Sequence, residues 1–507
     1  MLNLDNMDMD KIIIVLIIII IIIVVLMLSV NKTISKPTTQ GPTTQGPTTQ
    51  GPTTQGPTTQ GPTTQGPTTQ ALTTQAPTTI SPTTQTLTTS PIISHFITIK
   101  DFGAKGDGLT DDTTAIKNAI NAIRANDAKI KTLFIPEGTY LTKSILLRNV
   151  ENITIFGQNR NTTMIKLETI SNNSAHVFNL MDIKNITIKG LTIDASRDAI
   201  NQQIKEGKRH INSITGQPMS GGHGIRTGGS FHIGLVLDDI IIQNCFKYAL
   251  GCQKGNNSNF YINNFIVQNV GSDGMDFKNV PSLNDNINIT NGLIKNFALD
   301  DHGKPGLDLR GNFSISNIHI ELNHRRNVGI ELDRSGRGVV NNINILGAEL
   351  PDGEKAEYRG FVIAPPKDYN IDKSLTFNNI YVKNAKLANI YGITGVFNNM
   401  VSENAPGDAL DIGWDCSNRI PEYCNTGRNI IISNLEIKNP GKSAIIIKET
   451  AKNVIINGFN LSGIGHTEAI NITNSSENII LSNGFIPKEN LIVDDNDNAI
   501  KSNIIKI

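Results

Sequence analysis

The chain has 507 residues, and its 45 lysines and arginines equal its 45 aspartates and glutamates. A protein without surplus positive charge lacks the attraction to phosphates on which nucleic-acid binding depends, so nucleic acid is not an expected partner. Four cysteines are too few for a disulfide scaffold, and no two of them have the C-x-x-C spacing of a zinc module. The stability of the fold is therefore expected to come from packing.

A run of 19 uncharged residues at 12–30 follows a short N-terminal tail at 1–11. A helix of that length spans about 28 Å, close to the hydrocarbon thickness of a bilayer. The alternative is a cleaved signal peptide, but its apolar region is shorter and ends in a small-residue cleavage site that this run lacks. We expect an uncleaved, single-pass transmembrane signal-anchor helix that places the C-terminal domain outside the cytosol, on a virion or in a host membrane.

Residues 31–96 form a low-complexity segment in which the pentapeptide PTTQG occurs six times in succession from Pro37. The segment has almost no apolar side chains, and its regularly spaced prolines favour extended, polyproline-like conformations. It is predicted to be a disordered stalk. Its threonines are either O-glycosylation sites or parts of a passive spacer.

Residues 97–507 carry short runs of alternating apolar residues, each introduced by asparagine, aspartate or glycine, with a period of roughly 25 residues. The repeats contain no long amphipathic stretch, which excludes helical solenoids. The pattern predicts an all-β fold, a right-handed parallel β-helix, in which equivalent residues of successive coils stack about 4.8 Å apart. Recurrent asparagines such as Asn264, Asn317 and Asn342 are interpreted as ladders that form hydrogen bonds along the stack.

The domain opens with DFGAKGDGLTDDTTAI at 101–116, and FIPEGTY follows at 134–140. Asp111 or Asp112 is suited to be the N-cap of a helix whose apolar face consists of Ala115, Ile116, Ala119, Ile120 and Ile123. Both segments resemble the start of the pectate-lyase-like β-helix superfamily, which includes polygalacturonases, alginate epimerases and viral tailspike depolymerases. The resemblance implies a β-helix and a carbohydrate ligand, and we expect the helix to cap the open N-terminal end of the coils.

Two further expectations depend on resemblance. The isoleucine- and asparagine-rich composition, together with the PTTQG array, resembles proteins of giant DNA viruses and indicates a viral surface protein. The likeness to tailspikes also leaves a homotrimer open.

One strand of each coil begins with a glycine or alanine, which is followed by two apolar residues with one variable residue between them. Because side chains alternate along a strand, both apolar side chains must face the core. Between these inward residues, Asp276, Asp308 and Glu331 must point outward from successive coils. Two full charges about 4.8 Å apart repel by roughly 3 kcal/mol at an effective dielectric constant of 20, so something must compensate. The inward residues are Met275, Phe277, Leu307, Leu309, Ile330 and Leu332.

Two interpretations of this acidic row are open. Lys278 and Arg310 occupy the next outward positions and could neutralise the row as a solvated salt-bridge network. Alternatively, the row lines a carbohydrate groove, because a protonated carboxyl group beside ionised neighbours is what glycosidic cleavage requires. Such a row could also bind a hard cation such as calcium.

In the second interpretation, three residues form the catalytic acid/base set: Asp276, Asp308 and Glu331. Charged loops beside the row supply the predicted substrate contacts, which are Lys278, Asp301, His302, Arg310 and Arg326.

Two shorter fragments resemble enzymes of the superfamily. GGHG at 221–224 and SDGMD at 272–276 resemble polygalacturonase fragments, but in the reverse order, so that mechanism is not transferred. LTIDASRD at 191–198 and the coils after it resemble mannuronan C5-epimerases, whose catalytic tyrosine matches Tyr248, whereas the aspartate and histidine of that motif are replaced by Gly251 and Gln253. His223 is interpreted as a structural histidine.

The cysteines divide into two pairs. Cys416 and Cys424 enclose a short proline-containing loop and are expected to form a disulfide in a non-cytosolic domain, whereas Cys245 and Cys252 are expected to be buried.

The sequence thus predicts a membrane-anchored β-helix protein that binds and cleaves an acidic or surface polysaccharide, as a lyase or a glycoside hydrolase. The alternative is a glycan-binding or structural surface protein without catalytic activity on the same scaffold.

Overall fold

The computed structural model describes residues 95–125, 130–168, 176–208, 221–277, 284–324, 326–333, 337–349, 357–364, 374–391, 393–413, 429–473, 476–495, 497 and 499–507. The predicted tail, the predicted membrane helix at 12–30 and nearly all of the predicted stalk lie outside these residues, as do Cys416 and Cys424. None of the helices formed by the described residues is long and apolar enough to cross a bilayer.

The described residues belong to one compact unit, Thr89–Ile507, whose strands all join a single sheet system. Three helices accompany them: η2 (Ile99–Phe102), α2 (Thr113–Arg124) and α3 (Arg197–Lys205). One series of strands is short: β2 (Asp107–Asp111), β4 (Gly138–Thr142), β6 (Thr163–Leu167), β9 (Leu250–Gly251), β11 (Met275–Phe277), β13 (Pro305–Leu309), β15 (Val328–Asp333), β17 (Arg359–Ala364), β19 (Lys386–Ile390), β21 (Leu410–Ile412), β23 (Ile445–Ile447), β25 (Glu468–Ile472) and β27 (Leu491–Asp494).

Most strands of the second series are longer: β1 (Ile97–Thr98), β3 (Thr132–Ile135), β5 (Ile145–Gly157), β7 (Phe178–Asp194), β8 (Ile225–Cys245), β10 (Asn256–Val270), β12 (Asn284–Lys295), β14 (Phe313–Leu322), β16 (Gly338–Gly347), β18 (Ser374–Lys383), β20 (Thr394–Glu403), β22 (Ile430–Lys438), β24 (Lys452–Ser462), β26 (Glu477–Ile486) and β28 (Ile500–Lys506). Strands β7 and β8 run through both series.

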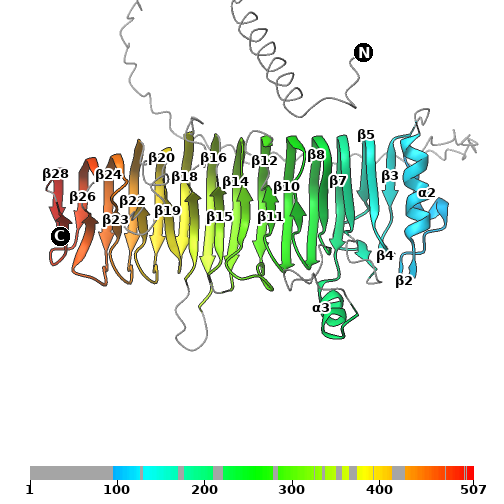
Figure 1. Cartoon of the computed structure of the whole chain (residues 1–507), viewed down its shortest axis with the longest axis horizontal. Helices are drawn as coiled ribbons and strands as arrows, with labels where there is room; N and C mark the ends of the chain where they lie inside the picture. Colours follow the sequence, from blue (N-terminus) through cyan, green and yellow to red (C-terminus); the bar gives the residue numbers. More distant parts are fainter. Residues whose placement is uncertain are drawn as a thin grey trace, which may run out of the picture. The chain divides into compact units, whose positions relative to one another are not determined.

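From β8 onward each strand pairs in parallel with the strand two positions later in the chain, so that each coil lies directly on the previous one. Figure 1 shows the coils stacked in chain order from α2 at one end to β28 at the other. This arrangement is that of a parallel β-helix and is consistent with the right-handed form predicted from the repeat period.

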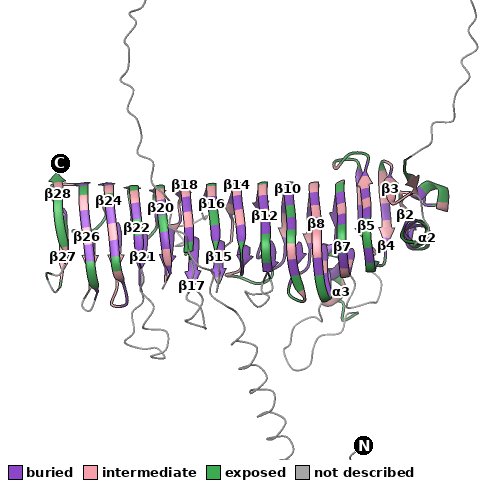
Figure 2. Cartoon of the chain, turned by 90° about the horizontal axis from the view of Figure 1, so that it is seen from above, coloured by how far each residue is buried: buried purple, intermediate pink, exposed green. Residues whose placement is uncertain are grey.

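The long strands turn a corner where an asparagine adopts a left-handed backbone conformation. Along β14 the alternation of buried and more exposed residues slips at Asn317, where two non-buried residues follow one another. The φ angle of Asn317 is +56°, a conformation that asparagine adopts at less cost than most other residues. Each such strand therefore bends at its asparagine, and buried and more exposed residues alternate along the strands on either side of the bend (Figure 2).

The predicted asparagine ladders are present, and most of their members are corner residues. The Nδ2 amide of Asn317 donates to Oδ1 of Asn291 at 2.9 Å, and Asn342 donates to Asn317 at 3.0 Å. The series continues with Asn379 donating to Asn342 at 2.9 Å and Asn399 to Asn379 at 3.1 Å. The recurrent asparagine is therefore doubly explained, by the corner conformation and by the bonds between coils.

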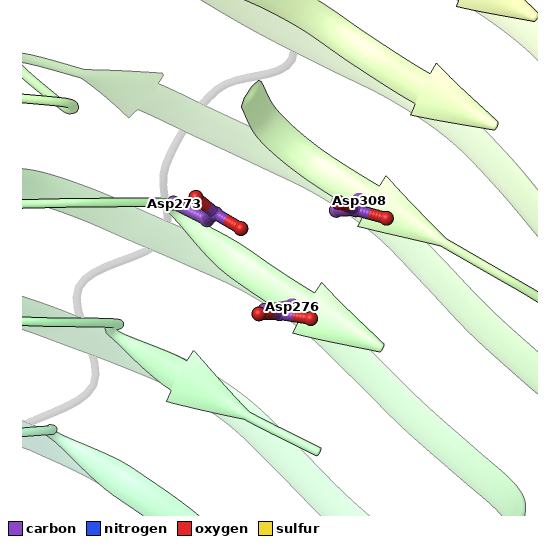
Figure 3. Close-up of side chains that lie close together, drawn as sticks. All are labelled: Asp273, Asp276 and Asp308. Carbon is purple, nitrogen blue, oxygen red and sulfur yellow. The ribbon is translucent and has the colours of Figure 1, made fainter. Parts of the chain in front are cut away.

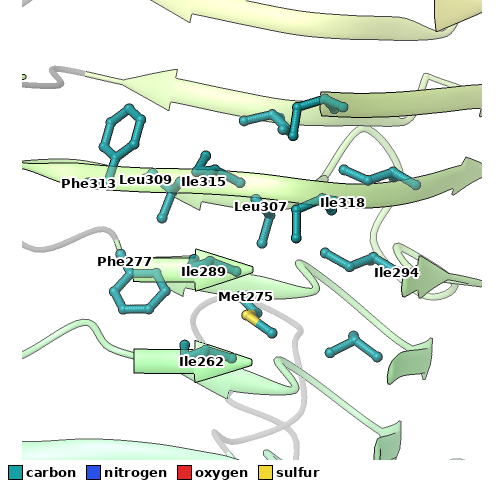
Figure 4. Packing of buried hydrophobic residues seen from close by; sticks show 14 of the residues in the cluster. Ile262, Met275, Phe277, Ile289, Ile294, Leu307, Leu309, Phe313, Ile315 and Ile318 are labelled. Atoms are coloured by element: carbon teal, nitrogen blue, oxygen red, sulfur yellow. The ribbon is translucent and has the colours of Figure 1, made fainter. Parts of the chain in front are cut away.

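The interior of the coils is a continuous apolar core. All six residues predicted to face inward from β11, β13 and β15 are buried, and Figure 4 shows Met275, Phe277, Leu307 and Leu309 packed against Ile289 and Ile315 from the adjacent faces. Cys245 and Cys252 are buried free thiols, as predicted, and burial raises the pKa of both thiols. Among the described residues the cysteines form no cross-link, and the apolar core and the ladders between coils stabilise the fold.

The opening motif has a structural role in a tight loop. The carboxylate of Asp112 accepts hydrogen bonds from the backbone of Lys105 at 2.6 Å and of Gly106 at 3.0 Å. A Cβ atom on Gly106 would lie 2.5 Å from Cε1 of Tyr140, so only glycine fits against that ring. The two segments of the motif, 101–116 and 134–140, are therefore in contact with each other.

Helix α2 forms where it was predicted, with the five apolar residues of its face buried against the first coils. Asp112 occupies the N-cap, as one of the two predicted positions, although its carboxylate accepts hydrogen bonds from the loop at 105–106 and makes no capping bond. Asp111 instead accepts a hydrogen bond from the backbone of Thr113 at 3.0 Å. The role of α2 as an end cap stays a prediction.

Candidate functional site

Strand pairing brings the predicted acidic residues into one row on the outer face of the short strands. Asp276 in β11 pairs in register with Asp308 in β13, and Asp308 pairs with Glu331 in β15. In the opposite direction, Asp276 pairs with Gly251, and Gly251 pairs with Arg226 in β8. We call these five residues, Arg226 to Glu331, the charged row.

The carboxylates at the centre of the charged row are covered, which the sequence did not predict. Asp276 and Asp308 are 0% exposed, as is Asp273, which directly precedes β11 (Figure 3). One carboxylate oxygen from each of these three residues lies within 4.8 Å of the other two. Glu331 remains partly exposed. Among the predicted catalytic residues, Glu331 is therefore the one that a large ligand can reach in this conformation.

Two neighbouring side chains hold the buried carboxylates in place. The amide Nε2 of Gln253 donates to Oδ2 of Asp276 at 2.7 Å, and the hydroxyl of Ser272 donates to Oδ1 of Asp273 at 3.2 Å. The same hydroxyl lies 3.5 Å from Oδ2 of Asp301, one of the predicted substrate contacts. Asp301 is thus placed beside the buried cluster.

The cluster of Asp273, Asp276 and Asp308 has the geometry of a hard-cation site. Calcium binds carboxylate oxygens at about 2.3–2.6 Å, so two ligand oxygens of one ion lie no more than about 5 Å apart. The 4.8 Å limit observed for the three carboxylates meets that condition. These three residues would hold a calcium ion, the cofactor that the sequence left open, and the ion would offset their mutual repulsion.

The other predicted substrate contacts are dispersed. Arg310 is half-buried at the end of β13, whereas His302 is exposed in the loop before that strand. Arg326 is exposed and forms an ion pair with Glu357, with Nε and Oε2 2.8 Å apart. Lys278 lies outside the described residues, so the predicted salt-bridge network is described only in part.

A second row lies beside the charged row and was not predicted. His176, His223, Tyr248 and Asp273 each stand two residues before paired positions in β7, β8, β9 and β11. The rings of His176 and His223 meet edge to face at 4.5 Å, and those of His223 and Tyr248 at 5.0 Å. We call this row, which consists of three rings and Asp273, the aromatic row.

Both histidines of the aromatic row are held in the neutral form. Burial, followed by the positive charge of Arg226, lowers the pKa of His176 to about 3. Burial, with smaller contributions from His176 and Arg226, holds the pKa of His223 well below its usual value. Neither ring therefore carries a charge at neutral pH.

The hydrogen bonding of His176 determines its tautomer. An Nη1 atom of Arg226 lies 3.3 Å from Nε2 of His176, and a guanidinium group can only donate. Nε2 must then accept, which places the ring proton on Nδ1. This buried donor has no hydrogen-bond partner among the described residues. Such an arrangement is more typical of a site that receives a ligand or water than of a structural histidine.

The structure also explains why the epimerase motif is altered at Gly251. A Cβ atom at this position would lie 2.9 Å from Nδ1 of His223 and 3.1 Å from Cδ2 of Tyr248. An aspartate, as the epimerase motif has at this place, would collide with the aromatic row. The ring of His223 occupies the space beside the charged row, and its interpretation as a structural histidine stays a prediction. The common position of His176, His223 and Tyr248, two residues before paired strand positions, becomes visible only once the register between the coils is known.

Fold and site together define the chain as a parallel β-helix protein with a charged row and an aromatic row on one outer face. Residues 96–349 match the family described as rhamnogalacturonase A/epimerase, pectate lyase-like, and the chain belongs to that family. The resemblance inferred from the opening motif is thereby confirmed.

Curated relatives match over shorter segments. The chain is 30% identical over 139 residues to the capsule-specific Depolymerase 1 of Klebsiella phage K5-2, covering 25% of this chain and 16% of that protein. It is 40% identical over 77 residues to alginate lyase 7 of Azotobacter vinelandii, covering 14% and 8%. It is also 37% identical over 82 residues to plasmin and fibronectin-binding protein A of Streptococcus pneumoniae, covering 16% and 11%. The chain thus spans less than a fifth of the length of these relatives.

Among solved structures, the A-module of the mannuronan C-5 epimerase AlgE6 from Azotobacter vinelandii aligns with a TM-score of 0.47 and 14% identity, covering 81% of this chain and 99% of that module.

Proposed function

We propose that this protein cleaves an acidic polysaccharide along the outer face of β8, β11, β13 and β15. The observation that carries the proposal is the adjacency of the charged row and the aromatic row on consecutive coils. Membership of a pectate lyase-like family, and relatives named as a depolymerase and an alginate lyase, support activity on a polysaccharide.

The residues divide into groups that bind and groups that transfer protons. Arg226 is partly exposed and supplies positive charge for an acidic sugar, while the buried ring of His176 accepts a hydrogen bond from its guanidinium group at 3.3 Å and positions it. Glu331 is the acid/base residue that the glycan contacts, because it is the exposed end of the row. Buried Asp308 is its register partner, about one coil spacing away. Asp276 completes the acid/base set through Asp308.

The test is incubation of the full chain with a panel of uronic-acid polysaccharides, with reducing ends and the ultraviolet absorbance of unsaturated products as readouts. Reducing ends without absorbance indicate a hydrolase, and both together indicate a lyase. Glu331→Gln should abolish either signal. Glu489→Gln, at an exposed glutamate of the final coils, is the matched control and should leave activity unchanged. Equal activity of both variants would refute the assignment.

A second function is favoured by one observation. Complete burial of Asp276 and Asp308 keeps two of the three predicted catalytic carboxylates away from a glycan in this conformation. A glycan-binding or adhesive surface protein needs no exposed acid, and one relative is named for binding plasmin and fibronectin. Glycan binding without product in the same panel would establish this alternative.

We also propose that residues 12–30 anchor the protein in a membrane, with the β-helix on the non-cytosolic side. The supporting observation is the long uncharged run in the sequence. Deletion of residues 1–35 should convert a detergent-requiring protein into a soluble one that loses the helical circular dichroism of the anchor and keeps the β-sheet signal. A full-length protein that is equally soluble without detergent would contradict the anchor.

A further inference from the structure

A cleft of about 390 Å³ lies further along the same outer face, beyond the charged row. The register continues from Glu331 to Val362 in β17 and then to Asn389 in β19. Asn389 lines the cleft. Since successive coils are about 4.8 Å apart, Asn389 lies about 10 Å from Glu331 along the stack. A glycan that contacts Glu331 and follows the stack would therefore reach the cleft.

Positive charge dominates the lining of the cleft. Arg359, Lys386 and Lys442 line it together with two carboxylates, Glu357 and Asp408. Both carboxylates have other interactions: Glu357 pairs with Arg326 at 2.8 Å, and Oδ1 of Asp408 accepts the backbone N–H of Ser443 at 3.2 Å. The charge of the cleft walls is therefore suited to an anion.

The cations of the cleft are incompletely neutralised. Lys386 shares its carboxylate, Asp411, with Lys448, at N–O distances of 3.0 and 2.8 Å. Two ammonium groups on one carboxylate leave a net positive charge. Among the described residues, neither Arg359 nor Lys442 has a carboxylate oxygen within 4.0 Å of its charged group. An anionic ligand would thus gain attraction without first displacing an ion pair from these two residues.

Two buried polar groups in the wall provide an independent indication of a ligand. Tyr358 is 1% exposed and Asn389 is 7% exposed, and both line the cleft. The hydroxyl of Tyr358 and Oδ1 of Asn389 have no hydrogen-bond partner among the described residues. Buried polar atoms in native proteins nearly always have partners. A half-turn of the amide exchanges Oδ1 and Nδ2, so Asn389 can donate to or accept from a sugar hydroxyl.

From these observations we infer that the cleft of Arg359, Lys386, Asn389 and Lys442 is a second saccharide-binding site, which takes an acid-substituted sugar unit of the chain that lies on the charged row. Arg359 and Lys442 contact the acidic group, and Asn389 contacts a hydroxyl. The inference depends on the proposed activity on an acidic glycan, because it assigns part of the same chain to this cleft. It adds a requirement for an acidic group about two coils beyond Glu331.

The experiment measures binding of the full chain to fluorescently labelled oligosaccharides of polygalacturonate, chondroitin sulfate and neutral dextran at low salt. The two acidic probes distinguish a carboxylate from a sulfate. Lys442→Glu replaces an attraction by a repulsion at an exposed site and should weaken binding of the preferred acidic probe about tenfold. Arg359→Gln should weaken it about threefold. Lys117→Glu, on the exposed side of α2, is the control with the same charge change and should have no effect.

The outcomes separate this inference from the proposed cleavage. Weaker binding in Lys442→Glu without any product from the unaltered chain would retain the cleft and refute cleavage. Cleavage that depends on Glu331, with equal affinity in the unaltered chain and Lys442→Glu, would refute the cleft alone. Equal binding of dextran and the acidic probes would also refute the cleft, and absence of binding to every probe would refute both.

Discussion

Gly251→Ala tests whether the two rows on the outer face are packed as one unit. The new Cβ atom would lie 2.9 Å from Nδ1 of His223, closer than real Cβ contacts permit. The His223 ring cannot move aside easily, because His176 and Tyr248 pack against its two neighbouring sides at 4.5 and 5.0 Å. We therefore expect strain at the centre of the candidate site.

The magnitude follows from two opposing effects. Overpacking in a closely packed region costs about 1–3 kcal/mol. Replacing glycine with alanine also reduces the backbone freedom of the unfolded chain, which stabilises the folded state by about 0.4–1 kcal/mol. The free energy of unfolding should thus fall by about 1–2 kcal/mol. Gly407→Ala is the control, because nothing lies within 4 Å of its added Cβ, and it should be neutral or slightly stabilising.

The assay is urea-induced unfolding followed by far-ultraviolet circular dichroism, carried out as a double-mutant cycle. In a His223→Ala background the steric overlap at residue 251 is gone, so Gly251→Ala should cost little there, and the coupling energy should approach the whole loss seen in the unaltered background. Gly251→Ala should also reduce glycan cleavage by displacing Tyr248. Identical stability losses in both backgrounds would show that His223 does not occupy the space beside Gly251.

Three other predictions test the ladders, the cation site and the neutral histidines. Asn342→Ala loses two ladder bonds and adds strain at a φ of +52°, so it should lower the free energy of unfolding by about 2 kcal/mol in the same urea assay. Asn342→Gly relieves the strain, so its loss should be about 1 kcal/mol smaller. Calcium should raise the thermal unfolding midpoint of the unaltered chain, and chelation should lower the midpoint again. Asp276→Asn should remove the effect of calcium. An equal rise of the midpoint in that variant would place the ion elsewhere. The pKa of His176 is about 3 in the folded state, below its unfolded value near 6.5. Its contribution to the free energy of unfolding is therefore complete above pH 6.5 and is lost as the pH falls towards 3. His176→Gln should flatten this decline of stability with pH, and an unchanged slope would contradict burial of the neutral ring.

Much of the architecture follows from the sequence. The recurrent asparagines and the alternating apolar residues predicted a parallel β-helix, and Asn317 and Asn342 occupy the predicted ladders. The sequence also predicted one row for Asp276, Asp308 and Glu331, because inward positions such as that of Met275 alternate with outward positions in every strand. Periodicity of two within a strand is a local property, so it can be read directly from residue order.

Other features depended on which residues of distant coils became neighbours. His176 and His223 are 47 positions apart and meet only because β7 and β8 pair in register. The burial of Asp276 and Asp308 was likewise hidden, because alternation shows that a side chain points away from the core and not whether other parts of the chain cover it. The cleft at Asn389 combines residues of β17 and β19 with loop residues that precede β17, β21 and β23.

The sequence by itself thus determined the coil, its core and the order of the acidic residues, since these depend on short-range alternation repeated many times. Only the tertiary structure decided the aromatic row, the accessibility of Glu331 and the cationic cleft. Coil lengths vary through insertions of unequal size, and the register between coils depends on hydrogen bonds between strands far apart in the chain, which no local pattern encodes.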